Sequence, residues 1–168
     1  MKKLKLYLET PTIIMVGPDQ DPIRQAITKD FFRLIAEKSD EYELFISPMV
    51  IRELNNAKSE EKRKRSLSFL DTLEHTELPQ NEEAENLASI YVTENVLTGR
   101  HINDLTHVAY AVVARCDYVV TWNMAHLANP KIVKRINEVN AIEKYSHIII
   151  ETPAFFTGDP THGKRSAN

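Results

Sequence analysis

The first apolar segment of the chain, "LKLYL" at residues 4–8, alternates leucine with other side chains. A period of two predicts a strand. Short apolar runs rich in β-branched residues, bounded by turn residues or helical patterns, predict three more strands. They lie at residues 42–47, 117–122 and 147–153.

Apolar residues recur at spacings of three and four in the segments between these strands, which predicts amphipathic helices. Ser47, Ser59 and Asn81 stand at expected N-caps, and Pro22, Pro48 and Pro130 at expected first turns. The predicted helices cover about 22–39, 48–57, 59–75, 81–97, 102–116 and 130–142.

This alternation of strands and helices predicts an α/β sandwich around a mostly parallel sheet. The length of 168 residues predicts one domain, residues 1–156, followed by a flexible tail at 157–168. Such folds bind ligands outside the carboxyl ends of their strands. Glu9 ends the first predicted strand and therefore lies at a position of this kind.

Composition narrows the class of protein without naming a function. The 24 acidic and 21 basic residues nearly balance, so the total charge indicates no nucleic-acid coat. A lone Cys116 cannot form an internal disulfide, and no apolar run reaches the roughly 18 residues of a membrane span. "MKKLKLYLE" turns acidic too early for a secretory signal, so we expect a cytoplasmic protein without membrane contact.

Three acids have settings that could bring them together: Glu9 after a strand, Glu53 on the next helix and Asp104 at the start of the most apolar helix. Asn123 follows the strand at 117–122 and could reach the same edge. Carboxylate and amide oxygens are the ligands of Mg²⁺ or Mn²⁺. Taken singly, Glu9 could be a solvated strand end, Glu53 an exposed acid and Asp104 an acid favoured by the helix dipole.

Several motifs resemble those of the PIN-domain family, the domain found in VapC-type ribonuclease toxins. They are "LYLETPTI", "ISPMVIREL", "NDLTHVAYAVV", "CDYVVTWNMAHLAN" and "IIIETPAFF", in this order over residues 4–156. The broad family usually has aspartate where this chain has Glu9, and often a fourth acid where it has Asn123. A subgroup with "YLET" and "TWN" resembles this chain more closely.

The resemblance implies a PIN-like three-layer sandwich of about five strands with helices on both faces. It makes Glu9, Glu53 and Asp104 the metal ligands, places Asn123 beside them, and makes Thr10 and Ser47 supporting hydroxyls. The implied reaction is Mg²⁺- or Mn²⁺-dependent hydrolysis of single-stranded or structured RNA by the toxin of a toxin–antitoxin pair. It also implies a homodimer and an antitoxin partner. The neutral Asn123 leaves a second hypothesis open, a catalytically weakened PIN-like module that binds RNA or a protein.

Further residues have a functional and a structural interpretation. His107 shares a helix face with Asp104 and could support the site, although a satisfied buried histidine explains it as well. Trp122 could stack on a base or pack against the sheet rim. The basic run, Lys62, Arg63, Lys64 and Arg65, could attract RNA. The alternative for this run is a solvated helix face with acidic partners three or four residues away.

Overall fold

A five-stranded sheet forms the centre of the molecule in the computed structural model, which describes residues 2–158. The strands are β1 (Leu4–Leu8), β2 (Tyr42–Ile46), β3 (Thr76–Glu77), β4 (Tyr118–Val120) and β5 (Ile149–Glu151). Their order across the sheet is β3-β2-β1-β4-β5, and every neighbouring pair is parallel. The predicted α/β class and parallel sheet are confirmed.

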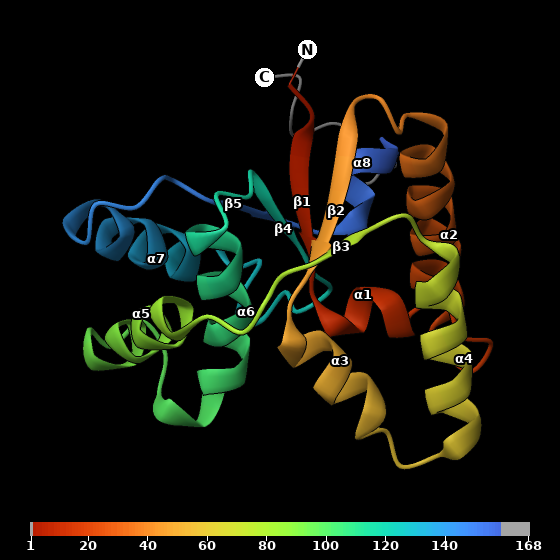
Figure 1. The fold of residues 1–168 in the computed structure, drawn as a ribbon, viewed down its shortest axis with the longest axis horizontal. Coiled ribbons are helices and arrows are strands. Elements are labelled where there is room, and N and C mark those ends of the chain that lie inside the picture. Colours follow the sequence, from red (N-terminus) through yellow and green to blue (C-terminus); the bar gives the residue numbers. More distant parts are fainter. Residues whose placement is uncertain (1, 159–168) are drawn as a thin grey trace.

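Helices cover both faces of this sheet. They are α1 (Thr10–Ile14), α2 (Pro22–Glu37), α3 (Pro48–Asn55), α4 (Glu60–Thr72), α5 (Glu82–Thr93), α6 (Ile102–Val113), α7 (Pro130–Ile142) and α8 (Pro153–Thr157). A 3₁₀ turn, η1 (Gly99–His101), precedes α6. Figure 1 shows α5, α6 and α7 on one side of the sheet, α2 and α8 on the other, and α1 and α3 beyond the carboxyl ends of β1 and β2. All six predicted helices are present, with ends that differ by a few residues.

Side-chain caps explain where several helices begin. Asp21, Ser59, Asn81 and Asn129 each accept hydrogen bonds from backbone N–H groups in the first turn of α2, α4, α5 and α7. Ser47 occupies the N-cap position of α3 but makes no side-chain cap bond. The prediction that Ser47 caps this helix is therefore corrected, because its hydroxyl contacts Tyr7 instead.

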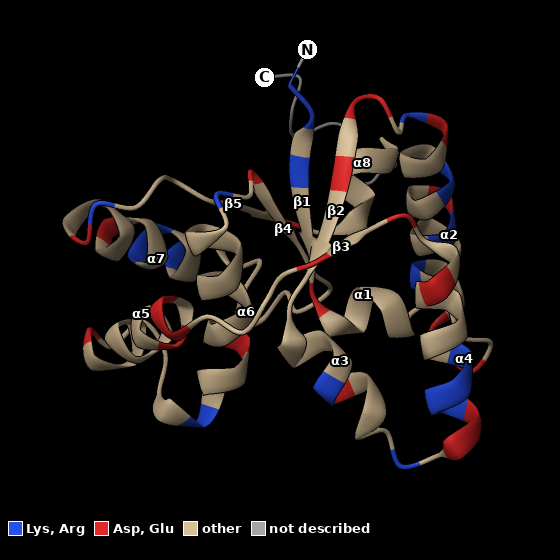
Figure 2. Cartoon of the chain, in the orientation of Figure 1, with Lys and Arg blue, Asp and Glu red and all other residues tan. Residues whose placement is uncertain are grey.

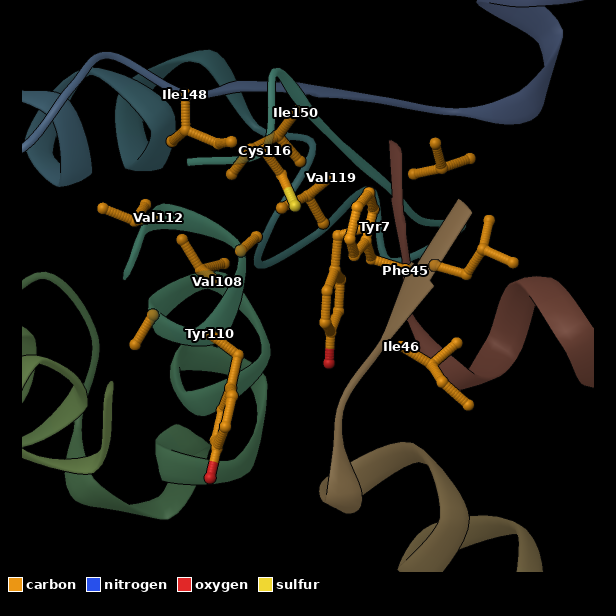
Figure 3. Packing of buried hydrophobic residues seen from close by; sticks show 14 of the residues in the cluster. Tyr7, Phe45, Ile46, Val108, Tyr110, Val112, Cys116, Val119, Ile148 and Ile150 are labelled. Carbon is orange, nitrogen blue, oxygen red and sulfur yellow. The ribbon is translucent and has the colours of Figure 1, made fainter. Parts of the chain in front are cut away.

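The core between the sheet and α6 is almost fully buried. Tyr7, Val119 and Ile150 lie on the sheet face toward α6, and Val108 and Val112 of α6 pack on the same cluster. Figure 3 shows these side chains between the helix and the strands. Eight consecutive residues of α6, from Leu105 to Val112, are buried, which agrees with its prediction as the most apolar helix.

Three short elements were absent from the sequence prediction. Strand β3 has two exposed residues, too few for a periodic pattern, and it is a strand because it pairs with Phe45 and Ile46. Helix α1 lies where Pro11 and Gly17 indicated a turn, although proline also suits the first turn of a helix. Helix α8 is fixed by packing, since Phe156 contacts the rings of Phe31 and Tyr118.

The predicted domain limits remain a prediction. Thr157 completes α8 and Gly158 follows it in the left-handed conformation, with φ of 67°. The rest of the predicted tail, residues 159–168, lies outside the described residues. Across residues 2–158, none of the helices combines the length and the hydropathy needed to span a membrane.

Asn140 provides a test of the packing between α5 and α7. It is fully buried, accepts a hydrogen bond from the Tyr91 hydroxyl at 2.5 Å and donates to Asn137. We expect Asn140→Ala to lower the free energy of unfolding by about 2 kcal/mol, because the buried Tyr91 hydroxyl loses its acceptor. Urea unfolding of Asn140→Ala, Tyr91→Phe and the double variant should show a double loss smaller than the sum. Additive losses would contradict the coupling.

Candidate active site

The order of the strands changes direction beside β1, so the carboxyl ends of β1 and β4 lie next to each other at one end of the sheet. The chain passes from β1 to β2 on one side of β1, whereas β4 pairs with β1 on the other side. Ligands of parallel α/β sheets bind outside the carboxyl ends of the strands at such a point. Glu9 follows β1 there, and Thr121 and Asn123 follow β4.

Glu9 is buried at this end of the sheet, with only 3% of its surface exposed. Its backbone N–H donates to the carbonyl oxygen of Val120, and its Oε2 accepts a hydrogen bond from the Thr121 hydroxyl. Burial raises the pKa of Glu9 to about 7, although the nearby His107 and the hydrogen bond from Thr121 lower it. The Asp104 and Glu53 carboxylates make smaller contributions that raise it. Glu9 is therefore not a solvated strand end, which was the alternative interpretation of this residue.

Glu53 lies on α3, at the same end of the sheet. Its Oε1 accepts a hydrogen bond from the Thr10 hydroxyl at 3.2 Å and contacts Nε2 of His107. His107 is fully buried, and its other ring nitrogen, Nδ1, lies 2.6 Å from the Tyr7 hydroxyl. Thr10 and His107 therefore support Glu53 directly. Ser47 is connected to Glu53 only through Tyr7 and His107, and its Oγ lies 2.7 Å from the Tyr7 hydroxyl.

Asp104 stands in the first turn of α6, as the sequence predicts. Its Oδ2 accepts a hydrogen bond from the side-chain amide of Asn123 at 3.2 Å and lies 3.7 Å from Nδ1 of His101. The backbone N–H of Asn123 donates to the Thr121 hydroxyl at 2.9 Å. Thr121 thus connects Glu9 with Asn123, and through it with Asp104.

The structure brings the predicted acids and Asn123 into one electrostatic neighbourhood at this end of the sheet. Figure 2 shows acidic segments just after β1, on α3 and on α6. Three carboxylates and an amide fit the donor chemistry of Mg²⁺ or Mn²⁺, and the raised pKa of Glu9 reflects in part their mutual repulsion. Over residues 2–158, however, no group of three or more His, Cys, Asp or Glu side chains has the geometry to hold a metal ion. Each of the three acids accepts or faces a donor from the protein instead.

Sequence spacing gave no sign of a histidine pair beside Asp104. His101 precedes α6 and His126 follows β4, and their ring centroids are 4.2 Å apart. The backbone N–H of His126 also donates to Asn123 at 3.1 Å, so the two segments meet next to the acids. Thr121 was missed as well, although its place between a buried strand and Asn123 in "TWN" was a usable signal.

The basic run on α4 already has partners. Lys62 and Arg65 both pair with Asp19, at 2.8 and 3.2 Å, and Lys64 pairs with Glu60 at 3.1 Å. The remaining member, Arg63, donates to a backbone carbonyl. The pairs of Lys64 with Glu60 and of Arg65 with Glu61 agree with the alternative interpretation, whereas Asp19 lies in another segment and was not foreseen. The role of the run in RNA binding stays a prediction.

Trp122 packs against the rim of the sheet. It is 7% exposed, its indole N–H donates to the Thr28 hydroxyl at 2.8 Å, and the Arg24 guanidinium lies 5.3 Å from the centre of a Trp122 ring. A nucleotide base could stack on that face only after Arg24 had moved. Trp122 therefore packs against the sheet rim, as one of its two interpretations predicted. Its stacking on a nucleotide base stays a prediction.

Comparison with solved structures establishes the fold. A chain of the VapBC2 complex from Rickettsia felis, solved with a DNA fragment from its promoter, is similar with a TM-score of 0.56 and 13% identity, over 89% of this chain and 98% of the other. VapC20 of Mycobacterium tuberculosis, a toxin that cleaves the sarcin-ricin loop, has a TM-score of 0.55 and 15% identity, over 72% and 92%. The chain has the VapC fold. The predicted PIN-like sandwich is therefore confirmed as a fold. The sequence itself matches no family model and no curated protein.

Glu9 should make the stability of the metal-free protein depend on pH. Because its pKa is about 7 in the folded protein and 4.5 for a glutamate in water, the folded protein keeps a proton that the unfolded chain releases. The free energy of unfolding should thus fall by about 3 kcal/mol as the pH rises from 4.5 through 7. Glu9→Gln should remove this fall, as measured by urea unfolding between about pH 4.5 and about pH 8.

The exposed glutamate Glu94 offers a matched control, since Glu94→Gln should keep the pH profile of the wild type. A Glu9→Gln profile that follows the wild type at every pH would show that the Glu9 carboxyl does not retain its proton on folding.

Proposed function

We propose that this protein is a metal-dependent endoribonuclease of the PIN type that hydrolyses single-stranded or structured RNA. One observation carries the proposal: Glu9 is buried at the carboxyl end of β1, and Glu53 and Asp104 are near enough to raise its pKa. Three carboxylates at one point repel one another unless they take up a proton or bind a cation. The VapC fold and the motif order support the same interpretation.

Glu9, Glu53 and Asp104 would hold the Mg²⁺ or Mn²⁺ ion. When bound, such an ion polarises a phosphate oxygen and lowers the pKa of a water that attacks phosphorus. The remaining residues orient these acids: Thr121 holds Glu9, Thr10 and His107 hold Glu53, and Asn123 holds Asp104.

We also propose a partner of the antitoxin kind, because a structure with the same fold is a VapBC2 complex bound to promoter DNA. The toxin of a toxin–antitoxin pair is the role that this partner implies. The homodimer and the cytoplasmic location remain proposals from the sequence.

The replacement of Asp104 tests the nuclease. Purified wild type with Mn²⁺ should cleave single-stranded RNA, and Asp104→Asn should cleave it at least about a hundredfold more slowly, because one ionic metal ligand is lost. Asp71→Asn on the exposed side of α4 is the matched control and should retain wild-type cleavage. Gel analysis of a labelled RNA measures the rates, and equal rates for wild type and Asp104→Asn would refute the assignment.

The second candidate function, an RNA- or protein-binding module with weakened catalysis, follows from Asn123. Its neutral amide donates to Asp104, at the position where many PIN domains have a fourth acid. If the nuclease proposal is correct, Asn123→Asp should bind Mn²⁺ up to about tenfold more tightly, because it adds a negative charge, and the wild type should already cleave. A wild type without cleavage or a thermal shift at millimolar Mn²⁺ would favour the binding module.

A further inference from the structure

A chain of buried hydrogen bonds leads from the centre of the sheet to Glu53. The Tyr7 hydroxyl on β1 lies 2.7 Å from Oγ of Ser47 and 2.6 Å from Nδ1 of His107. On the opposite edge of the imidazole, Nε2 of His107 contacts Oε1 of Glu53. Tyr7 and His107 are fully buried and Ser47 is 1% exposed, so water does not compete for the two contacts of the Tyr7 hydroxyl.

The hydrogen-bond partners allow one arrangement in which a neutral imidazole donates to Glu53. Burial, as the main cause, raises the pKa of the Tyr7 hydroxyl well above its usual value, so Tyr7 has one proton to donate. If Tyr7 donates it to His107, Nδ1 is the acceptor and Nε2 carries the hydrogen that faces Oε1 of Glu53. If Tyr7 donates to Ser47 instead and accepts from Nδ1, Nε2 can donate to Glu53 only from an imidazolium that carries both ring hydrogens.

The same chain selects one oxygen of Glu53. Thr10 donates to Oε1 at 3.2 Å, and His107 faces Oε1 as well. Oε2 is then the oxygen of Glu53 that is available to a ligand. Hydrogen bonds to the second atom of a ligating group are a common way to orient that group and increase its affinity for a metal.

We infer that Tyr7, through His107, is a positioning residue for Glu53: its hydroxyl keeps His107 in the tautomer with hydrogen on Nε2, and this hydrogen orients the Glu53 carboxyl toward a divalent cation. Ser47 supports Tyr7 by donating to its oxygen. This inference rests on the proposed function for the role of the cation, whereas the tautomer of His107 is a property of the metal-free protein.

The test uses Tyr7→Phe, which keeps the ring and removes the hydroxyl. Nitrogen-15 NMR of the metal-free wild type should show hydrogen on Nε2 of His107 and an unprotonated Nδ1, and Tyr7→Phe should lose this single tautomer. The dissociation constant of Mn²⁺, measured by calorimetry, should rise at least about tenfold in Tyr7→Phe.

Tyr91→Phe is the matched control. Tyr91 is also a fully buried tyrosine, and its hydroxyl donates to the side chain of Asn140, which is not part of the candidate site. It should lose stability and keep both the His107 tautomer and the Mn²⁺ affinity of the wild type. Ser47→Ala is a milder second variant, in case Tyr7→Phe does not fold, and it should weaken Mn²⁺ binding by a few-fold, about 0.5–1 kcal/mol.

Two results would overturn the inference: hydrogen on Nδ1 of His107 in the wild type, or Mn²⁺ affinities of Tyr7→Phe and Ser47→Ala equal to that of the wild type. A wild type that shows the Nε2–H tautomer but binds no Mn²⁺ would instead refute the proposed function and the cation's part in the inference. The orientation of His107 by Tyr7 would stand in that case.

Discussion

The hydrogen bond from the Thr121 hydroxyl to the buried Glu9 carboxyl joins the two strands between which the candidate site forms. Glu9 follows β1 and Thr121 follows β4, and these strands are neighbours although 112 residues separate the two side chains. The same hydroxyl accepts the backbone N–H of Asn123, whose amide then donates to Asp104. One threonine thereby connects Glu9, the loop after β4 and the acid at the start of α6. The candidate site depends on this contact, because it orients the Glu9 carboxyl.

The acids of the candidate site lie beside hydroxyl, amide and imidazole groups. Glu9 accepts from a hydroxyl, Asp104 from an amide and Glu53 from a hydroxyl beside the imidazole of His107. In the described part of the chain, no lysine or arginine forms a salt bridge with any of the three, whereas His101 and His107 lie within ion-pair distance of Asp104 and Glu53. A lysine or arginine would oppose the negative charge permanently, whereas hydroxyl and amide donors orient the oxygens and leave the charge in place. The arrangement is suited to attract a cation, and burial of Glu9 makes its ionisation costly in the absence of one.

The sequence predicted the parts of the fold and site that depend on local pattern. Strand ends and helix positions indicated that Glu9, Glu53 and Asp104 could come together at one edge of a parallel sheet, because all its strands end on the same side. The resemblance to PIN domains was needed to interpret them as one site. It could not predict β3, α1 or α8, which are too short for a period and form through tertiary contacts. Contacts such as Thr121 with Glu9 join residues far apart in the chain, and no local spacing specifies them.

Ser47 shows how local preference yields to the site. A serine before Pro48 is a strong helix-start signal, and an N-cap serine usually stabilises a helix by about 1 kcal/mol. Here its hydroxyl turns to Tyr7 and leaves the first turn of α3 without a side-chain cap, a loss that Pro48 limits because it has no N–H group. The chain thus gives up a local bond at the start of the helix that carries Glu53 in order to complete the contacts behind Glu53. Departures of this kind from local rules are expected where the order of a functional site outweighs the stability of one helix.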